Sequence, residues 1–110
     1  MSELVDITTQ SINGKLVKTV SARELWAFLE IKSRFNDWIK YQIKIYYLLE
    51  GVDYATFTEN LAKGGRLKEY FLTLNVATEL AMIRRNDKGR QLRQYFTEIE
   101  NRFQEDRNHE

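Results

Sequence analysis

Apolar residues recur at helical spacing in two neighbouring stretches within residues 20–43. In the first stretch they lie at i, i+3, i+4 and i+7, namely Ala22, Leu25, Trp26 and Leu29. In the second stretch the spacing is nearly the same, with Phe35, Trp38, Ile39 and Ile43. Because residues three and four positions apart share one side of a helix, each stretch predicts a short helix with one apolar face.

Capping residues set the expected ends of these two helices. Ser21 stands just before the first stretch, and Glu24 follows three residues later, which is the pattern of a capping box. Ser33 is the expected N-cap of the second helix, and it confines the turn to residues 31–33. Two helices joined by so short a turn predict a helix-turn-helix, with an ordinary helical hairpin as the alternative.

Turns that contain glycine predict two β-hairpins, one on each side of the helix pair. Asn13-Gly14 is the preferred centre of a type I′ turn and is expected to join strands at residues 7–12 and 15–20. A second hairpin is expected after a turn near Gly51, with strands at about 54–58 and 68–74. Its loop, residues 60–66, contains Gly64-Gly65, which tolerates positive φ angles, and has a basic tip.

Two further helices are expected after the second hairpin. Asn75 is the expected N-cap of a helix at residues 76–85, and Asn86-Asp87 separates it from a fourth helix and supplies the cap of that helix. Gly89 is expected to let the two helices approach closely. The fourth helix carries an apolar stripe formed by Leu92, Phe96, Ile99 and Phe103.

The expected fold class is α+β, in which a helix-turn-helix pair is flanked by two short β-hairpins and followed by two further helices. This layout is winged-helix-like. A single domain is expected over residues 1–110, with residues 1–6 and 104–110 frayed, because this length suits one core. The predicted core consists of Leu25, Phe28, Leu29, Phe35, Trp38, Ile39, Leu74, Leu80, Ile83, Leu92, Phe96 and Ile99.

Three short segments, taken in their order and spacing, closely resemble the AntA/AntB phage antirepressor domain. They read SAREL..FLEIKSRFNDWI, EGVDY and LTL..A.ELAM..RN.KGRQ.RQYF, and the resemblance covers roughly residues 16–103. The family usually has His where this chain has Trp26 and a small residue where it has Leu92, which argues against a polar role at position 26 and leaves the fold unchanged. Phage modules of the Rha, KilA-N and BRO-N type are similar in layout and are generally regarded as DNA-binding, an analogy of fold alone.

The resemblance implies a phage or prophage antirepressor, which binds a phage repressor protein and relieves repression of lytic genes. The alternative is a winged-helix-like transcription regulator that contacts DNA directly. The apolar stripe of the fourth helix leaves a homodimer or a higher homo-oligomer open. No membrane partner is expected, and the expected location is the cytoplasm of a bacterial host cell, because the chain has no Cys, no signal-like start and no apolar run approaching 18 residues.

Charge is nearly balanced overall but unevenly distributed. The net charge is +1 and the sequence pI is about 7.9, whereas free-standing DNA-binding domains commonly exceed about 9. Residues 32–44 carry a net charge of +3 and residues 63–93 one of +5, while residues 45–62 and 94–110 each carry −3. The basic residues are thus concentrated in two blocks.

These blocks supply the candidate residues for binding a protein partner or DNA. The turn and the outer face of the second helix contribute Lys32, Arg34, Asn36, Asp37, Lys40 and Lys44. The second hairpin contributes Lys63, Arg66 and Lys68, and the segment after the third helix contributes Arg85, Lys88 and Arg90. In a winged arrangement the helix and the hairpin loop lie on one side, as expected for a duplex-binding surface. The alternative is that the basic residues pair with acidic residues of the same chain, such as Asp87 and Glu79.

The sequence contains no catalytic or metal-binding pattern. Its one His, His109, lies in the expected frayed tail, and the patterns of zinc proteases, serine hydrolases and phosphate-binding loops are missing. No enzyme and no cofactor are therefore expected. The aromatic residues have the spacing of core residues, and stacking on unpaired bases is the alternative for Tyr41, Tyr46, Tyr47, Tyr54, Tyr70 and Phe71.

Overall fold

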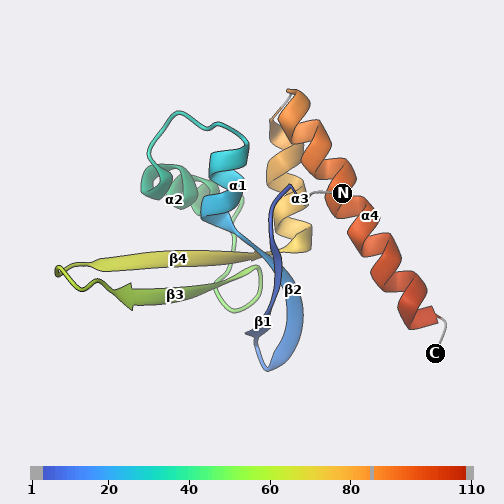
Figure 1. Ribbon diagram of the computed structural model, residues 1–110, viewed down its shortest axis with the longest axis horizontal. Coiled ribbons are helices and arrows are strands. Elements are labelled where there is room, and N and C mark those ends of the chain that lie inside the picture. Colours follow the sequence, from blue (N-terminus) through green and yellow to red (C-terminus); the bar gives the residue numbers. More distant parts are fainter. Residues whose placement is uncertain (1–3, 85, 109–110) are drawn as a thin grey trace.

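The computed structural model describes residues 4–84 and 86–108 (Figure 1). In these residues the elements follow in the order β1 (Ile7–Ile12), β2 (Lys15–Ser21), α1 (Ala22–Phe28), α2 (Phe35–Ile45), β3 (Tyr54–Asn60), β4 (Arg66–Thr73), α3 (Leu74–Ile83) and α4 (Asp87–Asn108). The α+β class, the two hairpins and the last two helices are confirmed. No helix within the described ranges is long and apolar enough to cross a membrane.

The four strands form one antiparallel sheet in the order β1-β2-β4-β3. Asn13 and Gly14 turn the first hairpin with φ angles of 54° and 78°, as a type I′ turn requires. Strands β2 and β4 join the hairpins through three residue pairs, whereas β3 and β4 pair over seven. The β3–β4 hairpin therefore continues well beyond the residues that pair with β2, and it projects from the body of the molecule (Figure 1).

The core lies where α1, α2, α3 and α4 cover the part of the sheet in which β2 pairs with β4. Leu25, Leu29, Ile39, Leu92 and Phe96 are fully buried there, as predicted. The prediction missed the part of the core that comes from strands and loops, chiefly Val20, Leu48, Tyr54, Tyr70 and Leu72, together with Val76, Ala77 and Ala81 of α3. Phe28 and Ile99 are partly buried. The prediction for Ile83 is wrong, because its side chain is 46% exposed.

Capping residues were predicted with mixed success. The Ser21 hydroxyl accepts a hydrogen bond from the backbone N–H of Glu24 at 3.4 Å, as predicted. The predicted cap Ser33 is wrong, because α2 begins one residue later, after Arg34. The predicted cap Asn75 is also wrong, because Thr73, the last residue of β4, is the N-cap of α3 and accepts from the N–H of Val76. There the strand passes directly into the helix.

The predicted tight turn between the first two helices is not observed. The connection from α1 to α2 contains six residues, 29–34, instead of residues 31–33 alone. Hydrogen bonds hold it, because the indole Nε1 of Trp26 donates to the carbonyl oxygen of Ser33 at 2.9 Å and the N–H of Ile31 donates to the carbonyl of Trp26. The helix-turn-helix and the winged-helix-like layout are therefore not confirmed.

The junction of α3 and α4 follows the prediction closely. The Oδ1 atom of Asn86 accepts from the N–H of Gly89 at 2.9 Å and so caps the start of α4. A Cβ atom at position 89 would lie 2.3 Å from the carbonyl oxygen of Arg84 and 2.6 Å from that of Ala81. Glycine is therefore required for this close approach. Fraying is predicted for residues 1–6 and 104–110, of which residues 1–3, 109 and 110 lie outside the described residues. Val5 is buried in the core, and α4 continues to Asn108.

Candidate partner-binding surface

The polar face of α2 is held outward by the burial of its opposite face. Phe35, Trp38 and Ile39 are buried on one side of the helix. Successive residues of a helix are about 100° apart, so the four predicted residues of its outer face point away from that side. These residues, Asn36, Asp37, Lys40 and Lys44, are all exposed, and so are Lys32 and Arg34 in the preceding connection.

A cluster of aromatic rings fixes the first turn of α2. The ring of Phe35 lies 5.8 Å from that of Trp26 in α1, 6.0 Å from that of Tyr70 in β4 and 6.4 Å from that of Trp38, measured between centroids. Aromatic pairs at such distances contribute beyond their buried area. The start of α2 is thus attached both to α1 and to the β3–β4 hairpin.

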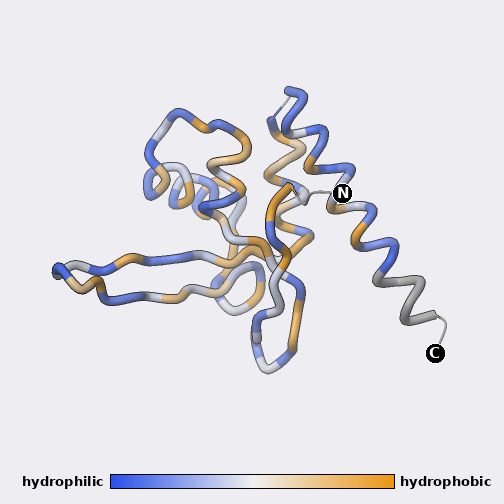
Figure 2. The backbone as a smooth tube through the Cα atoms, viewed as in Figure 1, coloured by the Kyte–Doolittle hydropathy of each residue, from blue (hydrophilic) through white to orange (hydrophobic). Residues whose placement is uncertain are grey.

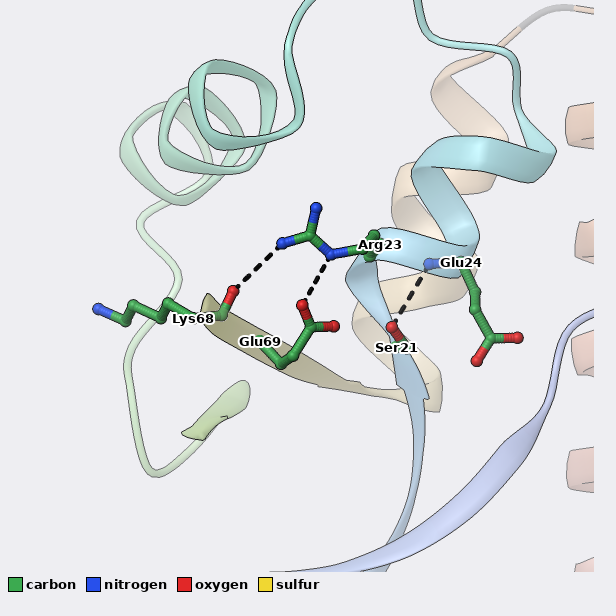
Figure 3. A network of polar contacts seen from close by, with 5 residues as sticks. All are labelled: Ser21, Arg23, Glu24, Lys68 and Glu69. Carbon is green, nitrogen blue, oxygen red and sulfur yellow. Dashed lines mark hydrogen bonds and ion pairs between the residues drawn. The ribbon is translucent and has the colours of Figure 1, made fainter. Parts of the chain in front are cut away.

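Arg23 reinforces this attachment with polar contacts (Figure 3). Its Nε donates to Oε1 of Glu69 at 2.7 Å, and its Nη2 lies 3.5 Å from the carbonyl oxygen of Lys68. The guanidinium group also lies 4.2 Å from the ring centroid of Phe35. One side chain therefore links α1, α2 and β4. The sequence analysis missed Arg23 and Glu69, since residues so far apart in sequence leave no local signal.

The basic residues of β4 share a face of the strand with Tyr70. Side chains at alternate positions of a strand share one face, so Arg66 and Lys68 lie on the same face of β4 as Tyr70. Because Tyr70 packs on Phe35, this face of the hairpin is the one that meets α2. The Nζ of Lys68 lies 5.3 Å from the centroid of the Tyr70 ring.

We call Arg34, Arg66 and Lys68 the basic corner; all three are exposed, Arg34 just before α2 and the other two on the face of β4 that carries Tyr70. Lys40 and Lys44 extend from it along α2, and Lys63 lies in the exposed hairpin loop. Figure 2 shows that the far end of the hairpin is mainly hydrophilic and that hydrophobic residues return where its strands reach the helices. The polar end of the hairpin is thus exposed, while its base belongs to the core.

The third predicted group of basic residues does not belong to this surface. The Nζ of Lys88 lies 3.2 Å from Oε1 of Glu30 and 5.0 Å from the Phe28 ring centroid, so it links α4 to the end of α1. Pairing within the chain is therefore observed, although its partner is Glu30 instead of the predicted acids. Arg90 is exposed beside a cavity of about 340 Å³ that Arg84 and Arg93 also line. Arg85 lies outside the described residues.

The aromatic residues divide into two groups. Tyr54 and Tyr70 are buried 5.9 Å apart, and burial, with a smaller effect of the nearby Glu50 carboxylate, raises the pKa of the Tyr54 phenol above its usual value of 10.0. Both are core residues, as their spacing predicts. Tyr41 within α2 is exposed, and so are Tyr46 and Tyr47 just after it.

Comparison with known proteins identifies the family of the chain. Residues 20–86, more than half of the chain, match the family model described as AntA/AntB antirepressor. The chain belongs to the AntA/AntB antirepressor family. This is a regulatory family and not a family of enzymes. No curated protein and no solved structure matches the chain.

The matched range contains both elements of the basic corner. It begins at the last residues of β2 and ends just before α4, so it includes α1, α2, the β3–β4 hairpin and α3. It also contains position 26, where the sequence analysis argues against a polar role. That inference is wrong, because the indole of Trp26 keeps an N–H donor and uses it on the carbonyl of Ser33. In the described part of the chain, no group of three or more His, Cys, Asp and Glu residues is placed to hold a metal ion.

Proposed function

We propose that this member of the AntA/AntB antirepressor family binds a phage repressor protein and thereby relieves repression of lytic genes. Family membership and the basic corner support the proposal. The corner has the attributes of a recognition surface, because its charged groups are exposed while the residues beneath them are buried. An acidic patch on the repressor is the complementary surface.

The composition of the α2 face favours a protein over DNA as the partner. Asp37 lies among the exposed basic residues of this face, and a carboxylate is repelled by a phosphate backbone. A protein surface with both signs of charge can pair with Asp37 as well as with Lys40. The net charge of +1 also gives little long-range attraction to nucleic acid.

The test is the release of operator DNA from a repressor–operator complex. The repressor is first captured on the immobilised chain from lysate of cells that carry a related prophage, and is then purified. Adding the chain to the complex is expected to release free DNA in a gel-shift assay without a slower band that contains all three components. A supershifted band, or operator binding by the chain alone, would contradict the proposal.

Charge reversal then locates the contact surface. Arg34→Glu and Arg66→Glu are expected to weaken repressor binding by about tenfold or more if the contacts are desolvated. Lys15→Glu is the matched control, because Lys15 is equally exposed but lies in the turn region of the β1–β2 hairpin. Equal losses in all three variants would show a general charge effect in place of a defined surface.

The projecting hairpin supports direct DNA binding as a second candidate. Its loop and β4 carry Lys63, Arg66 and Lys68 beyond the body of the molecule, where a wing would reach a phosphate backbone (Figure 1). On this hypothesis, affinity for a non-specific duplex falls steeply with salt concentration. Arg34→Ala, Lys40→Ala and Arg66→Ala are each expected to make the slope of log binding constant against log salt concentration shallower by about one unit. Fluorescence anisotropy at low salt measures this slope, and no binding at micromolar concentration would exclude the second candidate.

A further inference from the structure

The β3–β4 hairpin reaches well past the strand that attaches it to the body of the molecule. Strand β2 ends at Ser21, which is paired with Phe71, so residues 66–70 of β4 extend beyond it. These residues span about 17 Å at the rise of an antiparallel strand, so a swing of about 20° at Phe71 would displace Arg66 by about 6 Å. The positions of the basic residues on the hairpin therefore depend on what holds β4 beyond Phe71.

In the part of the chain that the structure describes, one edge of β4 has no neighbouring strand beyond Phe71. The N–H of Thr73 donates to the carbonyl oxygen of Asp53, and hydrogen-bonded positions alternate along an antiparallel strand, so the odd-numbered residues of β4 bond to β3. The carbonyl group of Lys68 consequently points to the opposite edge, the one along which β2 has already ended. A two-stranded ribbon is marginally stable by itself, so its direction needs support from other elements.

Arg23 supplies this support from α1 (Figure 3). Its side chain reaches the edge of β4 that β2 has left, where its Nη2 lies 3.5 Å from the carbonyl oxygen of Lys68 and its Nε donates to Oε1 of Glu69 at 2.7 Å. The same guanidinium group lies 4.2 Å from the ring centroid of Phe35, the first residue of α2. One planar group thus contacts the hairpin at Lys68 and contacts α2 at the residue that follows Arg34.

We propose that Arg23 is a positioning residue of the basic corner. It fixes the direction of the β3–β4 hairpin relative to α2, and so the position of Arg66 and Lys68 relative to Arg34. The side chains of Arg23 and Glu69 are 36% and 19% exposed, and ion pairs near the surface add little to overall stability. A partner that contacts both elements binds only molecules in which the hairpin has the correct direction, so apparent affinity falls with their fraction.

Arginine suits all three of these contacts, and lysine does not. The fork of N–H groups can bond a carboxylate and a carbonyl oxygen together, while the flat face of the guanidinium stacks on an aromatic ring. An ammonium group keeps the charge but has no such plane. Arg23→Lys is therefore expected to keep part of the positioning effect, and Arg23→Gln to lose it.

The first test measures the direction of the hairpin without any partner. The chain has no cysteine, so Lys44→Cys in α2 and Thr58→Cys in β3 place two spin labels at defined exposed positions. Pulsed electron–electron double resonance measures the distribution of distances between the labels. This distribution is expected to broaden in Arg23→Gln and to broaden less in Arg23→Lys. Arg102→Gln is the matched control, because it removes an exposed arginine–glutamate pair within α4 and is expected to leave the distribution unchanged.

The second test measures binding of the purified repressor, and it rests on the proposed function. Glu69→Gln raises the positive charge of the hairpin, so a charge effect alone would strengthen binding to an acidic surface. The positioning role predicts the opposite result, in which Glu69→Gln and Arg23→Gln both weaken binding by about threefold to tenfold. Arg102→Gln is expected to bind as the parent does, and thermal melts confirm that each variant folds.

The outcomes separate this proposal from the proposed function. An unchanged distance distribution in Arg23→Gln, or tighter repressor binding by Glu69→Gln, would overturn the positioning role. A broadened distribution with unchanged repressor affinity would also overturn it, because the direction of the hairpin would then not affect the contact. A parent chain that does not bind the repressor would contradict the proposed function, whereas a broadened distribution would still support the role of Arg23 in setting the direction of the hairpin.

Discussion

The two helix pairs of this protein are joined by different physical means. The pair α3–α4 is connected by a short turn and comes close enough at Gly89 that a Cβ atom there would collide with two backbone oxygens. Leu92 and Phe96 of α4 are fully buried. The pair α1–α2 has a six-residue connection and is held by the Trp26–Ser33 hydrogen bond and the rings around Phe35.

From this difference we expect the two helix pairs to differ in their effects on stability and on partner binding. The close approach of α3 and α4 at Gly89 makes this pair sensitive to added side-chain volume at that position. Hydrogen bonds at the surface fix the position of α1 relative to α2, but water can replace them in part. The matched family range contains all of α1 and α2, while α4 lies outside it. We therefore expect large stability effects from α3–α4 and effects on partner binding from the face of α2.

The largest expected effect comes from Phe96→Ala. The substitution removes a fully buried ring and leaves a cavity beside Leu92, so the free energy of unfolding is expected to fall by about 3–5 kcal/mol. Urea denaturation followed by circular dichroism measures it. The control is Gln94→Ala, which truncates an exposed side chain of the same helix and is expected to change little. A Phe96→Ala midpoint equal to that of the control would show that α4 does not contribute to the core.

Gly89→Ala is expected to have a smaller but still large effect. Its Cβ would lie 2.3 Å from the carbonyl oxygen of Arg84, and because that oxygen belongs to the backbone, α3 and α4 must move apart. Overpacking of this kind costs about 1–3 kcal/mol, against a gain of up to about 1 kcal/mol for alanine over glycine within a helix. Gln91→Ala, at an exposed position of the same helix, controls for helix propensity. A Gly89→Ala variant more stable than its parent would contradict the close approach.

Features set by a few adjacent residues could be predicted from the sequence. Asn13-Gly14, Ser21 and Asn86 act as predicted, because each satisfies a backbone requirement within three residues of itself. Gly89 also acts as predicted, through its close approach to the backbone of Arg84 and Ala81. The wrong cap at Asn75 has a physical cause. The start of α3 follows the end of β4, which pairing with β2 fixes at Thr73, and no local pattern at Asn75 contains that information.

The candidate surface could be predicted in part. Exposure of its charged residues follows from helix and strand periodicity, so Lys40 and Arg66 were identified correctly as exposed. The position of the hairpin relative to α2 depends on contacts between distant residues, Phe35 with Tyr70 and Arg23 with Glu69. Likewise, Ile83 has the spacing of a core residue but lines two open hollows between α2 and α3.

The smallest expected effect tests the α1–α2 connection. Trp26→Phe keeps an aromatic ring against Phe35 but removes the Nε1–H group that donates to the Ser33 carbonyl at 2.9 Å. This hydrogen bond is exposed, so water can replace it, and the free energy of unfolding is expected to fall by about 0.5–1.5 kcal/mol. Hydrogen exchange measured by NMR is expected to accelerate in residues 29–34 and to remain unchanged in α4. Equal acceleration of exchange in α4 would show that the two helix pairs open as one unit. The two pairs would then differ in how they pack but not in how readily they open.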